Sequence, residues 1–386
     1  MKRKILAFTG IRSEYDILYP VLKKFHCSDD FELSVVVSGA HLSQRHGMTS
    51  SLIEQDGFRI AERVDSLVDT DRLTQRPHAV ARLIAGFSQT VEREKPDILM
   101  VVGDREESIA VTIVGNYMNI LTAHIGGGDP VYGNADDPIR FAASKLAHIH
   151  FTTAKPYSDH LRNIGEDDWR ICFCGTPGLD NIVAEPEIPL PEIQSYLGQD
   201  LRHFIVLLKH PLSSEYYDAR YQMKTSLEAV GSFARRHDYT VVGIYPNTDP
   251  GSQEMVQEIE EFECDKIKFH KTLPRRIFIN LMRRARVLVG NSSMGILEAP
   301  MYGLPVVNIG NRQTGRLNAG NVEFVPYDSE TICQALEKAA LNENYRHKVK
   351  ALENPYGDGH AAERIAQFLS QTSIDDHWLT KRKLVP

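Results

Sequence analysis

Short apolar runs alternate with amphipathic helical patterns along almost the whole chain, and this alternation limits the fold more than any other feature of the sequence. The runs at residues 4–9, 96–102 and 285–289 have the length of buried strands, and each ends in a small or polar turn that opens a helical pattern. Strands that follow one another through helices form parallel sheets built from βαβ units. We therefore expect an α/β protein made of doubly wound, Rossmann-like sheets.

The chain divides into two similar halves. A proline-rich polar stretch covers residues 184–191, and the alternation of strands and helices restarts after it. We predict an N-terminal Rossmann-like domain over residues 1–182, a linker over 183–200 and a C-terminal Rossmann-like domain over 201–365. Residues 366–386 are predicted to form a helix and tail that pack back on the N-terminal domain. Because such sheets bind ligands beyond the carboxyl ends of their strands, we expect a cleft between the two sets of loops.

The composition is that of a soluble globular protein, with 42% hydrophobic and 25% charged residues among 386. The net charge of -7 argues against non-specific binding to nucleic acid. No apolar run approaches the roughly 20 residues that cross a bilayer, and the apolar run after the charged N-terminus is too short for a signal-peptide core. We therefore expect no membrane association and a cytoplasmic location. Five cysteines are too sparse for a disulfide framework.

The second half carries a pattern suited to an anion. A buried strand is followed by a small-residue turn that contains Ser292 and Ser293, and then by a short helix. The free N–H groups and the dipole of a helix N-terminus attract negative charge, and the serines add hydroxyl donors. Gly295 lies at the start of the same helix, and Glu298, predicted about two turns into it, could accept both hydroxyls of a ribose. The alternative is an ordinary N-capped helix of a doubly wound domain.

Acidic residues gather in the first half on loops that follow successive strands. Asp104 follows the strand at 96–102, Asp129 follows three glycines after the next strand, and Asp136 and Asp137 open the helix beyond. Carboxylates crowded at one sheet edge raise one another's pKa, which produces a base usable near neutral pH. The alternative is that these acids serve as helix N-caps.

Further polar residues lie on loops at the same ends of the strands. Arg12 follows the first strand, where it could hold a phosphate, and Arg105 follows Asp104; either could instead be a solvated surface charge. The second-half loops, with the serine pair, suit a nucleotide diphosphate. The remaining candidates for ligand binding are His41 and His124 in the first half and His210, Asn247, Arg312 and Arg316 in the second.

Two common nucleotide motifs are missing from the sequence. It holds no Gly-x-x-x-x-Gly-Lys-Ser/Thr phosphate loop and no Gly-x-Gly-x-x-Gly after the first strand, which disfavours ATP hydrolysis of that type and a nicotinamide cofactor. Cys172 and Cys174 alternate on a predicted strand without two further ligands at a suitable spacing, which favours packed thiols over a metal site. We expect neither a metal nor a cofactor.

Together these motifs resemble the UDP-N-acetylglucosamine 2-epimerase family, whose two-domain scaffold is called GT-B. The Gly-Asp-Arg triplet and the Ser-Ser pair resemble the hydrolysing branch of that family, whereas the non-hydrolysing branch more often reads Gly-Asp-Thr and Ser-Gly-Gly. Gly126 departs from the pattern, because many relatives carry an acid or a histidine there, and this leaves the base and the sugar open. Six stretches match in order and span almost the whole chain: residues 10–15, 103–105, 124–129 with 136–137, 209–211, 291–300 and 354–359.

The resemblance implies a reaction and roles for the first-half residues. UDP would be eliminated from UDP-N-acetylglucosamine to give 2-acetamidoglucal, and water would then add and release N-acetylmannosamine for sialic or nonulosonic acid synthesis. The resemblance makes Asp104 and either Asp136 or Asp137 the proton-transfer acids, with Asp129 as the next candidate. Arg105 would hold the sugar or an acid in place.

For the second half, the resemblance implies contacts to the nucleotide. His210, with Arg12 and the serine pair, would stabilise the departing diphosphate. Glu298 would hold the ribose, and Arg312 and Arg316 would border the uracil. The family also implies a homodimer or homotetramer.

Four other activities stay open at this stage. The substrate could be a nucleotide-linked 2,4-diacetamido-2,4,6-trideoxyglucose, as in legionaminic acid pathways, or the chain could belong to the non-hydrolysing branch. A GT-B glycosyltransferase would use the same nucleotide site but would need an acceptor, and the first-half acids count against it. A non-catalytic nucleotide-sugar sensor would tolerate loss of those acids.

Overall fold

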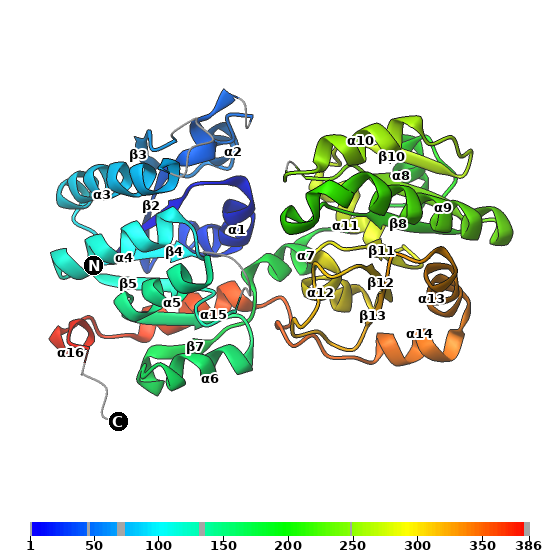
Figure 1. The fold of residues 1–386 in the computed structure, drawn as a ribbon. Coiled ribbons are helices and arrows are strands. Elements are labelled where there is room, and N and C mark those ends of the chain that lie inside the picture. The colour runs from blue at the N-terminus through cyan, green and yellow to red at the C-terminus, as the bar shows by residue number, and fades with distance from the viewer. Residues whose placement is uncertain (1, 45–46, 68–73, 131–135, 248, 382–386) are drawn as a thin grey trace. The chain divides into compact units, whose positions relative to one another are not determined.

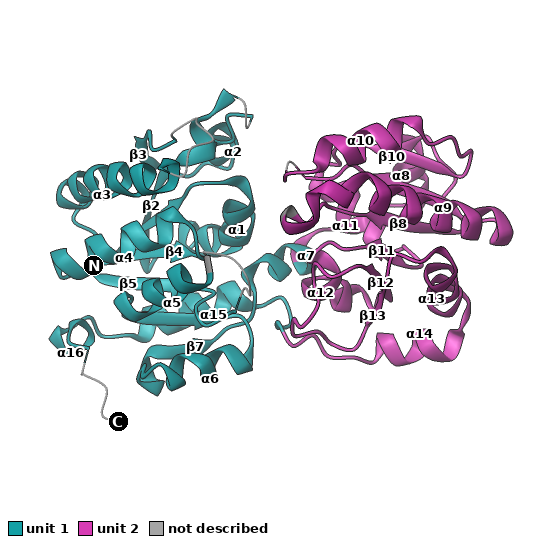
Figure 2. Cartoon of the chain, viewed as in Figure 1, with its two compact units in different colours: residues 1–183, 356–386 teal, residues 184–355 magenta. Residues whose placement is uncertain are grey.

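The computed structural model describes residues 2–44, 47–67, 74–130, 136–247 and 249–381 (Figure 1). Two compact units make up the chain, and Figure 2 colours them separately. Unit 1 consists of residues Met1–Val183 and Tyr356–Pro386, and unit 2 consists of Ala184–Pro355.

The unit boundaries differ from the predicted domain boundaries in two places. Residues 183–200, predicted as a linker, include helix α8 (Leu190–Leu197), which buries Ile193 and Leu197 in a core of unit 2. Residues 356–365, predicted with the second domain, lie in unit 1, where the hydroxyl groups of Tyr356 and Tyr157 are 3.0 Å apart. Prolines explain the first difference, because they open a helix as readily as they mark a linker.

Unit 1 contains a parallel sheet whose described strands have the order β3-β2-β1-β4-β5-β6-β7. The strand order reverses between β1 and β4, and open α/β sheets bind ligands at such a point. The strands are β1 (Arg3–Thr9), β2 (Phe31–Ser38), β3 (Ile60–Val64), β4 (Ile98–Val102), β5 (Leu121–Ile125), β6 (Ile149–Thr152) and β7 (Ile171–Phe173). The helices are α1 (Arg12–His26), α2 (Ser50–Gln55), α3 (Gln75–Glu94), α4 (Glu106–Met118), α5 (Asp136–Leu146), α6 (Lys155–Asn163), α7 (Asp180–Ala184, whose last residue belongs to unit 2), α15 (Ala361–Gln371) and α16 (Asp376–Leu379).

Alternating side chains of the central strands divide the interior of unit 1 into two cores. Ile5 and Ala7 of β1 belong to the core shared with α1 and α15, whereas Leu6 and Phe8 belong to the core shared with α3 and α4. Successive residues of a strand point to opposite faces, so a run of consecutive apolar residues is what a sheet covered on both faces requires.

Unit 2 repeats this architecture with a parallel sheet in the order β10-β9-β8-β11-β12-β13. Its order reverses between β8 and β11. The strands are β8 (Phe204–Leu208), β9 (Thr240–Ile244), β10 (Ile267–His270), β11 (Leu288–Gly290), β12 (Val306–Ile309) and β13 (Val322–Val325). The helices besides α8 are α9 (Ala219–His237), α10 (Ser252–Glu261), α11 (Arg275–Met282), α12 (Met294–Leu297), α13 (Ser329–Leu341) and α14 (Glu343–Lys350).

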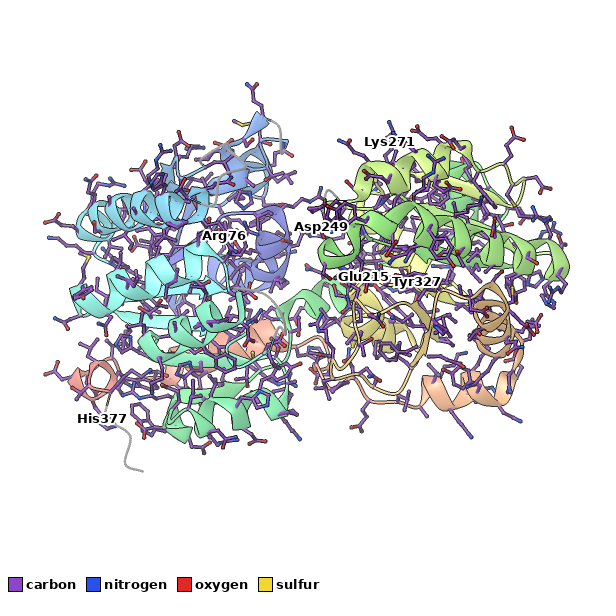
Figure 3. All side chains as sticks on the ribbon, in the orientation of Figure 1. Arg76, Glu215, Asp249, Lys271, Tyr327 and His377 are labelled. Atoms are coloured by element: carbon purple, nitrogen blue, oxygen red, sulfur yellow. The ribbon has the colours of Figure 1, made fainter. Side chains whose placement is uncertain are left out.

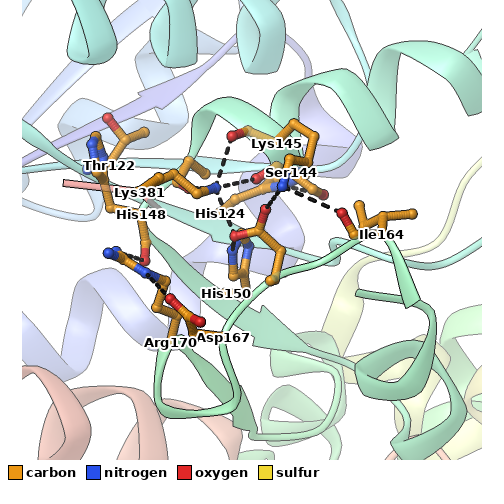
Figure 4. A network of polar contacts seen from close by, with 12 residues as sticks. Thr122, His124, Ser144, Lys145, His148, His150, Ile164, Asp167, Arg170 and Lys381 are labelled. Carbon is orange, nitrogen blue, oxygen red and sulfur yellow. Dashed lines mark hydrogen bonds and ion pairs between the residues drawn. The ribbon is translucent and has the colours of Figure 1, made fainter. Parts of the chain in front are cut away.

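A buried polar network ties the C-terminal segment to unit 1 (Figure 4). The Arg170 guanidinium donates to the carbonyl oxygens of His148 at 3.2 Å, Trp378 at 2.7 Å and Thr380 at 3.0 Å. Lys381 Nζ lies 2.6 Å from Glu166 Oε2 and donates to carbonyl oxygens at the end of α5 and just after it. Burial lowers the pKa of Lys381 to about 8. The segment that follows α15 is therefore held by main-chain carbonyls and one buried carboxylate.

The described ranges contain neither a membrane-spanning helix nor a cluster of metal-binding side chains. No helix there is long and apolar enough to cross a membrane. No group of three or more histidine, cysteine or acidic residues is arranged to hold a metal ion.

Candidate active site

Arg140 of α5 draws the first-half acids together at the carboxyl edge of the unit 1 sheet. Its Nη2 forms an ion pair with Asp104, which follows β4, and its Nη1 lies 3.8 Å from Asp129 Oδ2. The same Nη1 donates to the carbonyl oxygen of Gly126 at 2.8 Å. Arg140 is only 8% exposed, so its charge is balanced inside the site and not by solvent. The loops after β4 and β5 thus converge on one buried guanidinium.

Sequence reasoning missed Arg140, although Arg140 is the last residue of the Asp-Asp-Pro-Ile-Arg stretch at the start of α5. The sequence signal that could have identified Arg140 is its position about one helical turn after Asp136 and Asp137. Gly126, which departs from the family pattern, has a φ of +80°, a conformation that glycine adopts without strain. Its carbonyl oxygen is thereby available to Arg140. Asp137 is half-buried in the first turn of α5, and the side chain of Asp136 lies outside the part of the chain that the structure describes.

The His124 ring holds a backbone carbonyl, and the His41 ring contacts two threonine hydroxyls. His124 is completely buried, and its Nε2 donates to the Gly103 carbonyl oxygen at 2.6 Å while Nδ1 lies 3.2 Å from Ser144 Oγ. His41 is also fully buried, with its two ring nitrogens 3.0 Å from Thr9 Oγ1 and 2.7 Å from Thr49 Oγ1. Burial lowers the pKa to about 3 for His124 and about 4 for His41. His124 thus supports the loop after β4 and His41 the end of β1, and the contacts of both rings to a ligand stay a prediction.

Arg12 and Arg105 keep accessible guanidinium groups on those two loops. The Arg12 side chain is 56% exposed, with Nε 3.7 Å from Asp16 Oδ2. The Arg105 side chain is 45% exposed, with Nη2 3.6 Å from Glu106 Oε2. Because β1 and β4 are neighbours at the reversal point, these arginines flank the place where a doubly wound sheet holds its ligand.

Two buried glutamates lie beneath the arginine loops, and sequence reasoning missed both. Glu14 is in the first turn of α1, and Glu107 is in the first turn of α4. Glu14 Oε2 accepts from Gly10 N at 3.0 Å, and Glu107 Oε1 accepts from Ser38 Oγ at 3.1 Å. Burial and the neighbouring Glu107 raise the pKa of Glu14 to about 8. Their positions in the first turn of a helix are typical of exposed acids, so no local pattern indicates their burial.

In unit 2, Asn291 fixes the backbone of His210 and Asn247 fixes its ring. Asn291 Oδ1 accepts from His210 N at 2.7 Å, and its Nδ2 donates to His210 O at 2.8 Å. The backbone N–H of Asn247 donates to His210 Nδ1 at 3.0 Å. Burial and the nearby Arg312 lower the pKa of His210 to about 4. The imidazole is therefore neutral with its proton on Nε2, where it can donate to an anion.

Arg312 and a buried lysine add positive charge beside His210. Arg312 Nη1 donates to the Asn291 carbonyl oxygen at 3.2 Å, and its Nη2 lies 4.0 Å from Asp249 Oδ2. Lys209 is 1% exposed, with Nζ 3.3 Å from Tyr327 Oη and 4.5 Å from the ring centre. Burial lowers the pKa of Lys209 to about 7. Asp249 and Tyr327 are labelled in Figure 3, which draws all the described side chains. Lys209 lies in the matching stretch at residues 209–211, but it was not predicted as a site residue.

The helix after the serine pair is shorter than predicted. α12 spans Met294–Leu297, and Glu298 ends it instead of lying two turns inside. Pro300 has no N–H to continue the α-helix, and a 3₁₀ turn (Ala299–Tyr302) follows. Ser292 Oγ accepts from Met294 N at 3.4 Å.

Of the other second-half candidates, Gly295 packs in the core, whereas Arg316 belongs to the polar groups near Asn291. Gly295 is buried against Val306 of β12, which makes it a packing residue. Arg316 Nη1 donates to Gln313 Oε1 at 3.1 Å, and Gln313 in turn donates to the Asn291 carbonyl oxygen at 3.2 Å. Around β8 and β11 the structure thus gathers Lys209, His210, Asn247, Asn291, Ser292, Arg312, Gln313 and Arg316.

The fold and these two polar edges define a protein of two doubly wound units, with a set of acids in one and a set of polar and cationic groups in the other. A family model described as UDP-N-acetylglucosamine 2-epimerase matches residues 23–370. The chain belongs to this family, as the sequence motifs predicted.

Curated relatives match over nearly the full length. The UDP-N,N'-diacetylbacillosamine 2-epimerase (hydrolyzing) of Legionella pneumophila is 32% identical over 383 residues, which cover 99% of each chain. A UDP-N-acetylglucosamine 2-epimerase of Neisseria meningitidis is 29% identical over 343 residues, which cover 87% of each chain. The polysialic acid biosynthesis protein P7 of Escherichia coli is 29% identical, with 92% of this chain and 90% of that protein covered.

Solved structures show the same fold. The Neisseria meningitidis UDP-GlcNAc 2-epimerase bound to UDP-GlcNAc superposes with a TM-score of 0.76 at 17% identity, covering 96% of this chain and 100% of that one. The Methanocaldococcus jannaschii UDP-GlcNAc 2-epimerase gives a TM-score of 0.76 at 16% identity, with the same coverage. The predicted α/β fold of GT-B type, with two Rossmann-like parallel-sheet domains, is confirmed.

Proposed function

We propose that this chain is a hydrolysing 2-epimerase of a UDP-linked 2-acetamido sugar, with UDP-N,N'-diacetylbacillosamine as the first candidate substrate and UDP-N-acetylglucosamine as the second. The observation that carries the proposal is the convergence of Asp104 and Asp129 on the buried Arg140. The order of the candidates rests on the full-length relative whose name carries the diacetylated sugar and the hydrolysing mode. N,N'-diacetylbacillosamine is a 2,4-diacetamido-2,4,6-trideoxy sugar. The diacetamido-trideoxy substrate, which the sequence left open as an alternative, is therefore our first candidate.

The proposed reaction has two stages. A carboxylate of unit 1 takes the proton from C2 of the sugar, the C1–O bond breaks, and its electron pair leaves with the β-phosphate of UDP, giving a glycal. Water then adds its hydroxyl at C1, and C2 receives a proton on the opposite face. Asp104 is the proposed base, and Asp129, Asp136 and Asp137 are the proposed sources of the second proton. A positioned acid or base contributes about 100- to 10,000-fold to such a step.

The groups around β8 and β11 are proposed to hold UDP. A neutral His210 donates from Nε2 to the diphosphate, Arg312 balances part of its charge, and the Ser292 and Ser293 hydroxyls donate hydrogen bonds to it. Glu298 is proposed to accept from the ribose, with Arg316 at the uracil. These hydrogen bonds strengthen as negative charge develops on the leaving diphosphate, so they stabilise the transition state more than the ground state.

Proton NMR in D2O distinguishes the candidate reactions. The purified protein is incubated separately with UDP-N,N'-diacetylbacillosamine and with UDP-N-acetylglucosamine, without an acceptor. Release of UDP together with the free 2-epimer deuterated at C2 supports the hydrolysing reaction and identifies the sugar. A UDP-linked epimer would place the chain in the non-hydrolysing branch instead. Absence of turnover on both sugars would refute the proposal.

We also propose a homodimer or homotetramer, which follows from the family resemblance. Light scattering on the purified protein tests this assembly, because a mass close to the 43.6 kDa of one chain contradicts it.

A further inference from the structure

Two carboxyl groups meet at Gly10, at the point where the strand order of unit 1 reverses. Glu14 comes from the helix after β1, and Glu107 comes from the helix after β4. The Gly10 N–H donates to Glu14 Oε2 at 3.0 Å. A Cβ at Gly10 would lie 1.9 Å from Glu107 Oε1, so Glu107 occupies the space that a side chain there would need. The glutamates are 7% and 4% exposed, so both are shielded from solvent.

The hydrogen bonding of this pair is incomplete as long as both groups are ionised. Among the described residues, no donor reaches Glu14 Oε1 or Glu107 Oε2. Ionised carboxylates only accept hydrogen bonds, and two of them buried together repel each other. One proton on either group supplies the missing donor and removes one charge, as in carboxyl pairs that share a proton.

We propose that Glu14 and Glu107 share one proton, and that the protonated pair locks the loop after β1 to the loop after β4. The pair then acts as positioning residues for Arg12 on the first loop and for Asp104 and Arg105 on the second. Only its effect on turnover rests on the proposed function; the shared proton itself does not.

The charges around the pair agree with a single remaining negative charge. Arg105 is the cation that favours ionisation of both glutamates, whereas burial raises the pKa of each. Loss of the shared proton would place a second negative charge beside Asp104, which already opposes ionisation of Glu14. The titratable and charged groups that face the pair are Asp104, Arg105 and Glu106 from the loop after β4 and α4, His41 from the turn after β2, and Arg76 of α3, which pairs with Glu106.

Infrared difference spectroscopy tests the shared proton directly, without substrate. At about pH 7, below the pKa of about 8, the full chain should show a protonated-carboxyl stretch that Glu14→Gln lacks and Glu107→Gln also lacks. Glu92→Gln, an exposed change on α3, is the matched control and should keep the band. Loss of the band in both pair variants supports the proposal. Its persistence in either, or its absence from the unmodified protein, overturns it.

The pH profile of turnover tests the positioning role. Above about pH 8 the unmodified enzyme should lose kcat by up to tenfold per pH unit, as the pair loses its proton. Glu14→Gln cannot lose that proton, so the ratio of kcat at about pH 9 to kcat at about pH 7 should rise relative to the unmodified enzyme and to Glu92→Gln. An unchanged ratio overturns the positioning role. If the unmodified protein turns over neither sugar, the proposed function fails while the infrared result still decides the shared proton.

Discussion

Replacement of Arg140 by methionine tests whether one guanidinium organises the acid site. Arg140→Met keeps the length of the buried stem but removes the ion pair to Asp104 and the hydrogen bond to the Gly126 carbonyl. It also leaves Asp104 and Asp129 near each other without the cation between them.

The cost follows from the burial of the groups that remain. Breaking a buried ion pair by removing one partner costs about 3–5 kcal/mol, and a lost hydrogen bond from a charged donor about 1.5–3 kcal/mol. The Asp104 side chain is 20% exposed and can recover some hydration, so the low end applies, about 3 kcal/mol. For a domain of this size that lowers the Tm of unit 1 by about 6–12 °C.

Thermal unfolding followed by circular dichroism measures this shift in Tm. Calorimetry with UDP measures the affinity of unit 2 for the nucleotide. UDP affinity should stay near that of the unmodified protein, because the proposed nucleotide groups belong to unit 2. Arg140→Lys should recover only part of the loss, since a lysine cannot form the forked contact. Arg82→Met, on the exposed side of α3, is the control and should change stability by less than about 0.5 kcal/mol. A Tm of Arg140→Met equal to that of the control would refute the reasoning.

Three further predictions concern single side chains. Asp104→Asn should lower turnover by at least about 100-fold with little change in UDP affinity, and near-normal turnover would remove Asp104 from the mechanism. UDP binding should take up protons at about pH 7.5, because a phosphate raises the lowered pKa of Lys209; calorimetry in buffers of different ionisation enthalpy detects this uptake, and its survival in Lys209→Met would contradict the assignment. Arg170→Met should speed amide exchange in residues 376–381, which its guanidinium holds, and unchanged exchange there would show that the remaining contacts suffice.

The fold could be predicted because each buried parallel strand is a short run of consecutive apolar residues, which is visible in the local sequence. The run at 4–9 became β1, Arg3–Thr9, and the polar residues after the strands of each half came to the carboxyl edge of its sheet. That a loop reaches the edge follows from chain order and sheet direction alone. The presence of Asp104 and Asp129 in one cluster was therefore accessible from the sequence.

What could not be predicted is the direction and depth of individual side chains. His124 and His41 occupy positions that put them near the edge, but their rings turn into the interior, where His124 holds a backbone carbonyl and His41 contacts two threonine hydroxyls. Glu14 and Glu107 look like ordinary first-turn acids, and only the tertiary fold brings both of them to Gly10 and buries them there. Arg140 gains its role from partners 36 and 14 residues away in the chain. Such contacts depend on tertiary packing, which local periodicity does not encode.

The order in which the chain leaves the ribosome bears on how the two units form. Unit 2 is one uninterrupted stretch, Ala184–Pro355, whereas the sheet of unit 1 is packed against α15 from the last part of the chain. The core of unit 1 needs Ile365 and Leu369, and Asp180 accepts the backbone N–H groups that open α15 at 2.9 and 2.7 Å. Domains fold as units during synthesis, so the second half encoded can complete its core while the first still awaits its final helix. A chain that ends at Pro355 and has been released from the ribosome should therefore contain a finished unit 2 and an unfinished unit 1 that chaperones can bind.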